Sequence, residues 1–159
     1  MILITHSVVG AALARYVPSA LLAFLFGIVS HYVLDRIPHW HYHVPHVKKA
    51  TLAPFGKKSF SFSRAVAPDV AKVAFDFAVG LAISLYFFSG DIVSIFLGSF
   101  GAVLPDLLVG AAKLWPQRLL VAHDKFHRRN HTLVRLDDQP LLGIGSQAAL
   151  VVLVILLFR

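Results

Sequence analysis

The chain has 159 residues, of which 57% are hydrophobic, and its mean hydropathy is +0.72. These values exclude an ordinary soluble domain, and the apolar runs are too long and continuous for the strands of a membrane barrel. The net charge of +7 is concentrated in the loops between these runs, which favours cytoplasmic loops facing anionic lipid and argues against a nucleic-acid partner. We therefore expect an all-α fold, a polytopic membrane helical bundle with about four to five apolar helices plus a cytoplasmic amphipathic helix, in a single domain over residues 1–159.

The first half of the chain contains two apolar segments and a polar loop. Residues 2–16 barely cross a bilayer at about 1.5 Å per residue, so we expect a short, tilted or re-entrant helix. Residues 19–37 form a clearer span, which Pro38 stops. Residues 39–64 are basic and aromatic, as is typical of the membrane interface.

The second half contains three further spans and one polar helix. Residues 66–89 and 92–114 are expected to span the membrane on either side of a tight turn at Ser89-Gly90-Asp91. Residues 117–131 form a polar or amphipathic helix, and residues 141–158 form the last span. The span at 92–114 carries three glycines that allow close helix contact, Gly98, Gly101 and Gly110.

The distribution of lysine and arginine predicts the topology. Residues 36–64 and 113–135 are rich in both, whereas the turn at 89–91 has neither. Basic loops remain on the cytoplasmic side, so we expect both basic segments inside, the turn outside, and an inner (plasma) membrane location. If residues 2–16 cross the membrane, the N-terminus lies inside and Arg159 outside.

Histidine and aspartate are unusually prominent. The chain has nine histidines, eight acidic residues that are all aspartate, and no cysteine. An ionisable side chain in an apolar segment is costly and indicates a functional site. By helical rise, His31 lies about 7 Å and Asp106 about 10 Å from the predicted cytoplasmic ends of their spans. Histidine with aspartate and without cysteine is a ligand set for zinc or manganese.

Helical spacing supports a shared site. His31 and Asp35 are four residues apart on one helix face, and His39 would continue this face if the helix continued past Pro38. Two further sets share a face in the same way: Asp69 with Asp76, and His123 with His127 and His131.

Simpler structural roles compete with this interpretation. Interface placement explains the histidines that alternate with aromatics after Trp40, a cap explains Asp69, and an ion pair with Lys72 explains Asp76. Asp35 beside Arg36 could be a helix-end ion pair. The remaining residues with a simple explanation are His41, His43 and His46 at the interface, Asp91 in its turn, and Asp124, Asp137 and Asp138 in solvent.

Three short motifs resemble a known family. They are Thr5-His6 followed by Gly10, Leu104-Pro105-Asp106 in a glycine-rich helix, and HRRNHT at residues 127–132. This order resembles the LexA-regulated, membrane-bound metal-dependent hydrolases, which are distantly similar to zinc-dependent phospholipase C. The resemblance implies an integral inner-membrane hydrolase with a His/Asp metal centre, and it carries over to His6, Asp106, His127 and His131. The chain departs from the family in PDLLVG, which lacks the acidic or histidine position that often follows the PD, and in HRRNHT, which replaces the usual glycine and is one residue shorter.

Our first hypothesis is therefore an enzyme that hydrolyses a phosphoester of a lipid or lipid-linked substrate by metal-activated water. The membrane lipid is then both substrate and environment. Lys125, Arg128 and Arg129 would neutralise phosphate charge, and Asp76 or Asp35 would serve as general base. Two or three zinc ions, or manganese, would be held by residues from several segments: His6, His31, Asp35, His39, Asp76, Asp106, His127 and His131.

Two other classes remain open. A non-catalytic metal-binding membrane protein or a metal or proton transporter would also place histidine and aspartate in apolar segments. Transport needs a polar path to the outer face, and residues 83–88 and 92–97 are apolar apart from Ser84 and Ser94. A haem protein with two histidine ligands needs facing histidines at matched depth, and His31 alone lies well inside a strong span.

Overall fold

The computed structural model describes residues 1–41, 44–50, 64–134 and 136–159, and no strand occurs among them. Three of its helices, α4 with the preceding turn, α5 and α7, are long and apolar enough to cross a membrane, and α1 and α2 are shorter apolar helices. The expected all-α membrane bundle is therefore confirmed. In chain order the elements are α1 (Leu3–Ala14), α2 (Ala20–Leu34), α3 (Pro45–Ala50), the 3-10 turn η1 (Arg64–Val66), α4 (Ala67–Phe87), α5 (Ile92–Leu114), α6 (Arg118–Asn130) and α7 (Pro140–Phe158).

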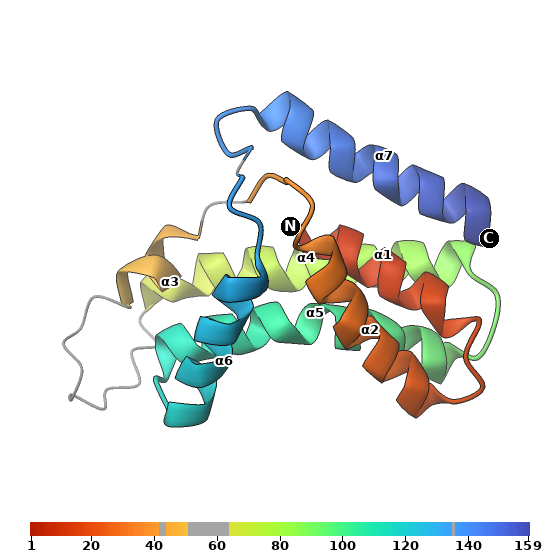
Figure 1. The fold of residues 1–159 in the computed structure, drawn as a ribbon, viewed down its shortest axis with the longest axis horizontal. Helices are drawn as coiled ribbons and strands as arrows, with labels where there is room; N and C mark the ends of the chain where they lie inside the picture. Colours follow the sequence, from red (N-terminus) through yellow and green to blue (C-terminus); the bar gives the residue numbers. More distant parts are fainter. Residues whose placement is uncertain (42–43, 51–63, 135) are drawn as a thin grey trace.

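The first two helices form a hairpin against α5. They have 12 and 15 residues, or about 18 and 22 Å at the helical rise, against about 30 Å for a bilayer core. Ser19 begins α2 by accepting the Leu22 N–H through its hydroxyl. Figure 1 shows that the start of α1 and the end of α2 meet near the middle of the bundle. The hairpin thus delivers two chain segments to one level.

Glycines allow the hairpin to approach α5 closely. A Cβ atom placed on Gly10 of α1 or on Gly27 of α2 would lie 2.3 Å from the Gly98 carbonyl oxygen, and one on Gly101 would lie 2.2 Å from the Phe24 carbonyl oxygen. The predicted close contacts at Gly98 and Gly101 are confirmed. The one at Gly110 is wrong, since nothing lies within 4 Å of a Cβ there. Gly110 instead lines a cavity beyond the open end of the hairpin.

The turn between α4 and α5 has the expected chemistry. Gly90 has a φ of +148°, which favours glycine. Asp91 caps α5 by accepting the backbone N–H of Ser94 at 2.8 Å. This tight turn and the C-terminal end of α1 lie at the same end of the bundle (Figure 1).

The segments that follow α2 and α6 pair with each other at the opposite side of the hairpin. The Thr132 N–H donates to the Asp35 carbonyl at 2.8 Å, and the Leu136 N–H donates to the His39 carbonyl at 3.2 Å. Because both bonds have the same offset along the chain, residues 35–39 and 132–136 run parallel. Helix α6 is set on α5 by His123, whose Nε2–H donates to the Pro105 carbonyl at 3.0 Å.

Helix α7 closes this region through one buried amide. The Gln147 side chain accepts the Ile2 N–H at 2.8 Å and donates to the Trp40 carbonyl at 3.2 Å. Trp40 also packs on Gly143, where an added Cβ would lie 2.5 Å from the tryptophan Cβ. The start of α1, the segment after α2 and the start of α7 are therefore fixed together.

Candidate metal centre

Four ligand atoms from three helices converge in what we call the mixed group, formed by His31, Asp35, Asp106 and His127. His31 lies on α2 and Asp35 ends it, while Asp106 lies on α5 and His127 on α6. Nε2 of His31 lies 2.9 Å from Nε2 of His127 and 3.1 Å from Oδ2 of Asp35. Nε2 of His127 lies 3.2 Å from the same oxygen and 3.3 Å from Oδ1 of Asp106.

These separations fit a single small cation. The remaining histidine–carboxylate distance, from His31 Nε2 to Asp106 Oδ1, is 3.9 Å. Zinc bound tetrahedrally at about 2.0–2.1 Å holds its ligand atoms about 3.3 Å from one another. Five of the six edges of the mixed group are thus close to those of a tetrahedral zinc site.

Asp35 is the centre of a wider histidine shell. Its carboxylate is 2% exposed, and Oδ1 lies 3.3 Å from Nε2 of His6 and 3.8 Å from Nε2 of His39. Oδ2 lies 3.7 Å from Nε2 of His131. Within the described chain, neither Asp35 oxygen has a hydrogen bond of ordinary geometry, and the same holds for both ring nitrogens of His6. Buried polar atoms without partners are costly, and a bound cation would satisfy them.

The two imidazoles of the mixed group differ in protonation. Nδ1–H of His31 donates to the Ala102 carbonyl at 2.8 Å, which leaves Nε2 of the neutral ring to accept or to bind metal. For His127, burial disfavours the charged form, but hydrogen bonds to Asp106 and then Asp35 raise its pKa to about 9 in the metal-free protein. A proton on His127 therefore occupies the position that a metal would take.

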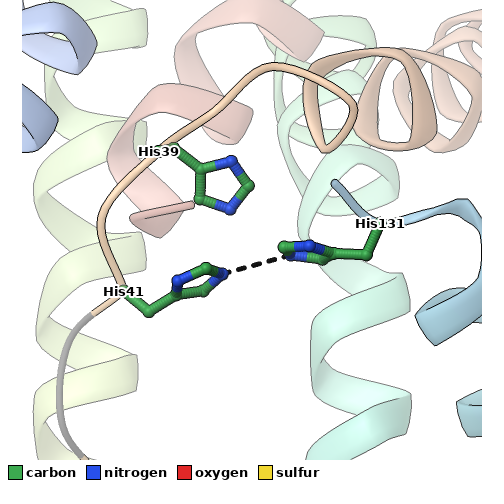
Figure 2. A group of neighbouring side chains, drawn as sticks. All are labelled: His39, His41 and His131. Carbon is green, nitrogen blue, oxygen red and sulfur yellow. Dashed lines mark hydrogen bonds between the residues drawn. The ribbon is translucent and has the colours of Figure 1, made fainter. Parts of the chain in front are cut away.

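Three further histidines form what we call the histidine group: His39, His41 and His131 (Figure 2). His39 and His41 follow α2, and His131 follows α6, so the parallel pairing described above brings them together. Nε2 of His41 lies 3.2 Å from Nε2 of His131. Burial lowers the pKa of His39 to about 3 and also lowers those of His41 and His131. These rings are neutral at pH 7, the form that binds metals.

Both groups face one cavity of about 810 Å³. Asp106 and His127 of the mixed group line it, as do His41 and His131 of the histidine group. Its other walls combine Lys113 and Arg128 with apolar side chains of α3, α4 and α5, among them Val47, Val70, Val73, Leu107 and Leu114.

Most of the predicted metal ligands gather around Asp35, and Asp76 does not belong to either group. Asp76 lies on α4, and its Oδ2 accepts the Leu3 N–H at 2.6 Å. This contact caps α1 from a neighbouring helix and sets the position of His6, one turn further on. Asp35, proposed as a general base, is enclosed by imidazoles, a position that favours a ligand. The residues brought together are His6, His31, Asp35, His39, Asp106, His127 and His131.

The predicted phosphate-binding residues are divided. Arg128 lines the cavity and forms an ion pair with Asp124 at 2.5 Å. Lys125 and Arg129 lie on the exposed face of α6, and neither is among the described residues that line the cavity.

Sequence reasoning gave no functional role to His41 or Asp137. His41 had been explained by interface placement and Asp137 by solvent, yet Asp137 Oδ1 lies 2.9 Å from Nδ1 of His41. The spacing His39-x-His41 contained a usable signal, because residues two apart in an extended segment point to the same side. His43, two residues further, lies outside the described residues.

Asp69 is a cap, as predicted, but for another helix. Its Oδ2 accepts the backbone N–H groups of His46 and Val47 at 2.8 and 3.1 Å, so it holds the start of α3 rather than its own α4. The buried Asp69 thereby places α3 as a wall of the cavity.

No protein-family model matches the chain, and neither does any curated protein or solved structure. The site is therefore interpreted from its own chemistry.

Proposed function

We propose that the chain is a membrane-bound, metal-dependent hydrolase that cleaves a phosphoester of a lipid or lipid-linked substrate. The observation that carries this proposal is the near-tetrahedral mixed group opening on a cavity with apolar walls. The sequence motifs that resemble metal-dependent hydrolases support it, since His6, Asp106, His127 and His131 all lie at this centre. Zinc fits the ligand set and distances, and manganese is the alternative metal.

The ligand set suits hydrolysis. A metal bound here lowers the pKa of a water molecule and so supplies hydroxide near neutral pH. Asp35 and Asp106 contribute two negative charges, which offset a divalent ion. Asp35 is buried, but the Asp106 side chain is 28% exposed and faces the cavity. The open side of the site is thus where a substrate can enter.

The cavity favours an amphiphilic phosphoester. Apolar side chains of α3, α4 and α5 form walls suited to acyl or prenyl chains, while Arg128 at the cavity offers a guanidinium to phosphate oxygens. In the cleavage, the water oxygen forms a bond to phosphorus, the bond from phosphorus to the ester oxygen breaks, and the leaving alkoxide takes a proton.

The location of the centre agrees with the proposed topology. Asp106 lies about 12 Å from the C-terminal end of α5 by helical rise, near the end of the bundle where Arg64 begins η1 and Lys113 ends α5. We place this end at the cytoplasmic face of the inner membrane, where lipid headgroups and water meet.

Phospholipid hydrolysis in mixed detergent micelles tests the proposal. The protein is stripped with a chelator, reloaded with zinc, and assayed for the phosphorylated headgroup and for diacylglycerol. We expect turnover by the wild type and a loss of at least about 100-fold in Asp106→Asn, as expected when a metal ligand is replaced. Asp138→Asn, a change in an exposed carboxylate, should retain activity.

The result that would contradict the proposal is equally specific. Zinc-loaded wild type that releases no product from phospholipids, lipid-linked phosphates or acyl esters would exclude a hydrolase. Stoichiometric zinc without turnover would then favour the non-catalytic metal-binding alternative.

A further inference from the structure

We infer that the histidine group is a second metal site, in which Asp35 is shared with the first ion and Asp137 is the positioning residue of His41. The inference rests on the proposed function, because the second ion would make the centre a paired-metal hydrolase. It assigns a role to His41 and Asp137, for which the sequence suggested only surface roles.

The hydrogen bonds of the three rings fix their tautomers. Nδ1 of His39 lies 2.6 Å from the Ile37 carbonyl, and Nδ1 of His131 lies 3.2 Å from the Thr132 carbonyl. Nδ1 of His41 faces the Asp137 carboxylate. Carbonyl and carboxylate oxygens accept, so each Nδ1 carries a hydrogen. In the neutral rings every Nε2 therefore holds a free lone pair.

These lone pairs converge. Nε2 of His41 and Nε2 of His131 lie 3.2 Å apart, and neither neutral ring has a hydrogen to place between them. Nε2 of His39 is buried and has no hydrogen-bond partner in the described chain. Figure 2 shows the three rings turned toward one space. A proton could bridge one pair, but only a cation satisfies all three nitrogens, and the 3.2 Å separation is close to the roughly 3.3 Å of ligands on tetrahedral zinc.

Asp35 connects this space to the mixed group. Its Oδ1 lies 3.8 Å from Nε2 of His39, and its Oδ2 lies 3.1 Å from Nε2 of His31 and 3.7 Å from Nε2 of His131. A carboxylate that reaches two ligand sets is suited to bridging ions, which lie about 3.5–4 Å apart in paired-metal hydrolases.

The second site has the composition of a catalytic position. Three histidines with a shared carboxylate resemble the open arrangement in which water completes the zinc shell. His41 and His131 line the cavity, so the free position would face the substrate. The mixed group, with four protein ligands, would hold the more enclosed ion.

Asp137 holds His41 by two contacts. Besides facing the ring, its Oδ1 accepts the His41 backbone N–H at 3.0 Å. The parallel pairing of residues 35–39 with 132–136 places Asp137 opposite His41. A carboxylate on the far nitrogen of a ligating histidine orients the ring and strengthens metal binding, and loss of such a partner typically costs about 10–100-fold in affinity.

Metal stoichiometry tests the inference without an activity assay. Detergent-purified protein is stripped, reloaded with zinc, freed of excess metal and analysed for zinc per chain. We expect two ions in the wild type, one in His41→Ala and two in the matched control His46→Ala, whose ring contacts Asp69 outside the group. Circular dichroism and gel filtration establish that each variant is folded.

Asp137→Asn supplies the second measurement. We expect the weaker zinc affinity to fall by about 10–100-fold while the tighter one is unchanged, and Asp138→Asn should match the wild type. One ion in the wild type, or two in His41→Ala, would overturn the second site. Unchanged affinities in Asp137→Asn would overturn the positioning role. Two ions without hydrolysis would contradict the proposed function alone, whereas hydrolysis with one ion would contradict this inference alone.

Discussion

Asp35 and Asp76 illustrate how burial and partners separate two carboxylates that the sequence treats alike. Asp35 faces five histidines, whereas Asp76 accepts the N–H of Leu3. We expect Asp35→Asn to reduce zinc affinity by more than about 100-fold, because a metal ligand should cost more than an outer-shell partner. We expect Asp76→Ala to retain its zinc and to lose about 1 kcal/mol of stability, since it removes a helix cap. Zinc analysis and thermal unfolding of both variants measure this contrast, and loss of zinc in Asp76→Ala would restore Asp76 as a ligand.

The protonation of His127 predicts a pH dependence of metal binding. Without metal its pKa is raised to about 9, so the ring is charged at pH 7, while zinc requires the neutral ring. Binding to the mixed group should therefore release a proton from His127, and affinity should rise about tenfold per pH unit until pH approaches 9. The pKa of His39 is lowered to about 3, so this ring should release none near pH 7.

Calorimetry in buffers of different ionisation enthalpy measures the released protons. Close to one proton for the ion in the mixed group, and none for the ion in the histidine group, is the expected result. A proton count of zero for both ions would mean that His127 is neutral in the metal-free protein.

At the scale of elements, hydrophobic runs and stop signals were sufficient. The predicted spans at 66–89, 92–114 and 141–158 differ from α4, α5 and α7 by at most two residues at an end, because long apolar runs have few alternative structures. The polar helix at 117–131 corresponds to α6. The sequence did not show α3, since its start depends on the distant Asp69. It also extended the second span too far, because α2 ends at Leu34 before Pro38.

Close packing of the hairpin on α5 predicts a sharp difference between two glycines. Gly10→Val would place a Cβ 2.3 Å from a backbone oxygen of Gly98, which no side-chain rotation relieves. We expect a loss of about 1–3 kcal/mol, typical of overpacking, together with weaker zinc binding as His6 is displaced. Gly110→Ala is the control, because a Cβ there meets nothing. Thermal unfolding in detergent compares them, and equal stabilities would contradict the packing.

At the scale of the whole molecule, the site is assembled from segments that are far apart in sequence. Depth and helical spacing were enough to select His31, Asp106 and His127, because each lies on a helix with a defined face. His39 was selected for a reason that is wrong, since the helix does not continue past Pro38 and the residue arrives on an extended segment instead. The role of His41 depends on the pairing of residues 35–39 with 132–136, a tertiary contact that periodicity cannot show.

The absence of native cysteine allows the topology itself to be tested. Ser89 lies in the turn between α4 and α5, and Lys125 lies on the exposed face of α6 beside the metal centre. Because basic segments remain cytoplasmic, we expect a membrane-impermeant maleimide to label Ser89→Cys in intact cells with a permeabilised outer membrane, and to label Lys125→Cys only after the inner membrane is opened. The cysteine-free wild type gives the background. The reverse pattern would place the cavity at the outer face, where its substrates would be the lipids of that leaflet rather than those of the cytoplasmic one.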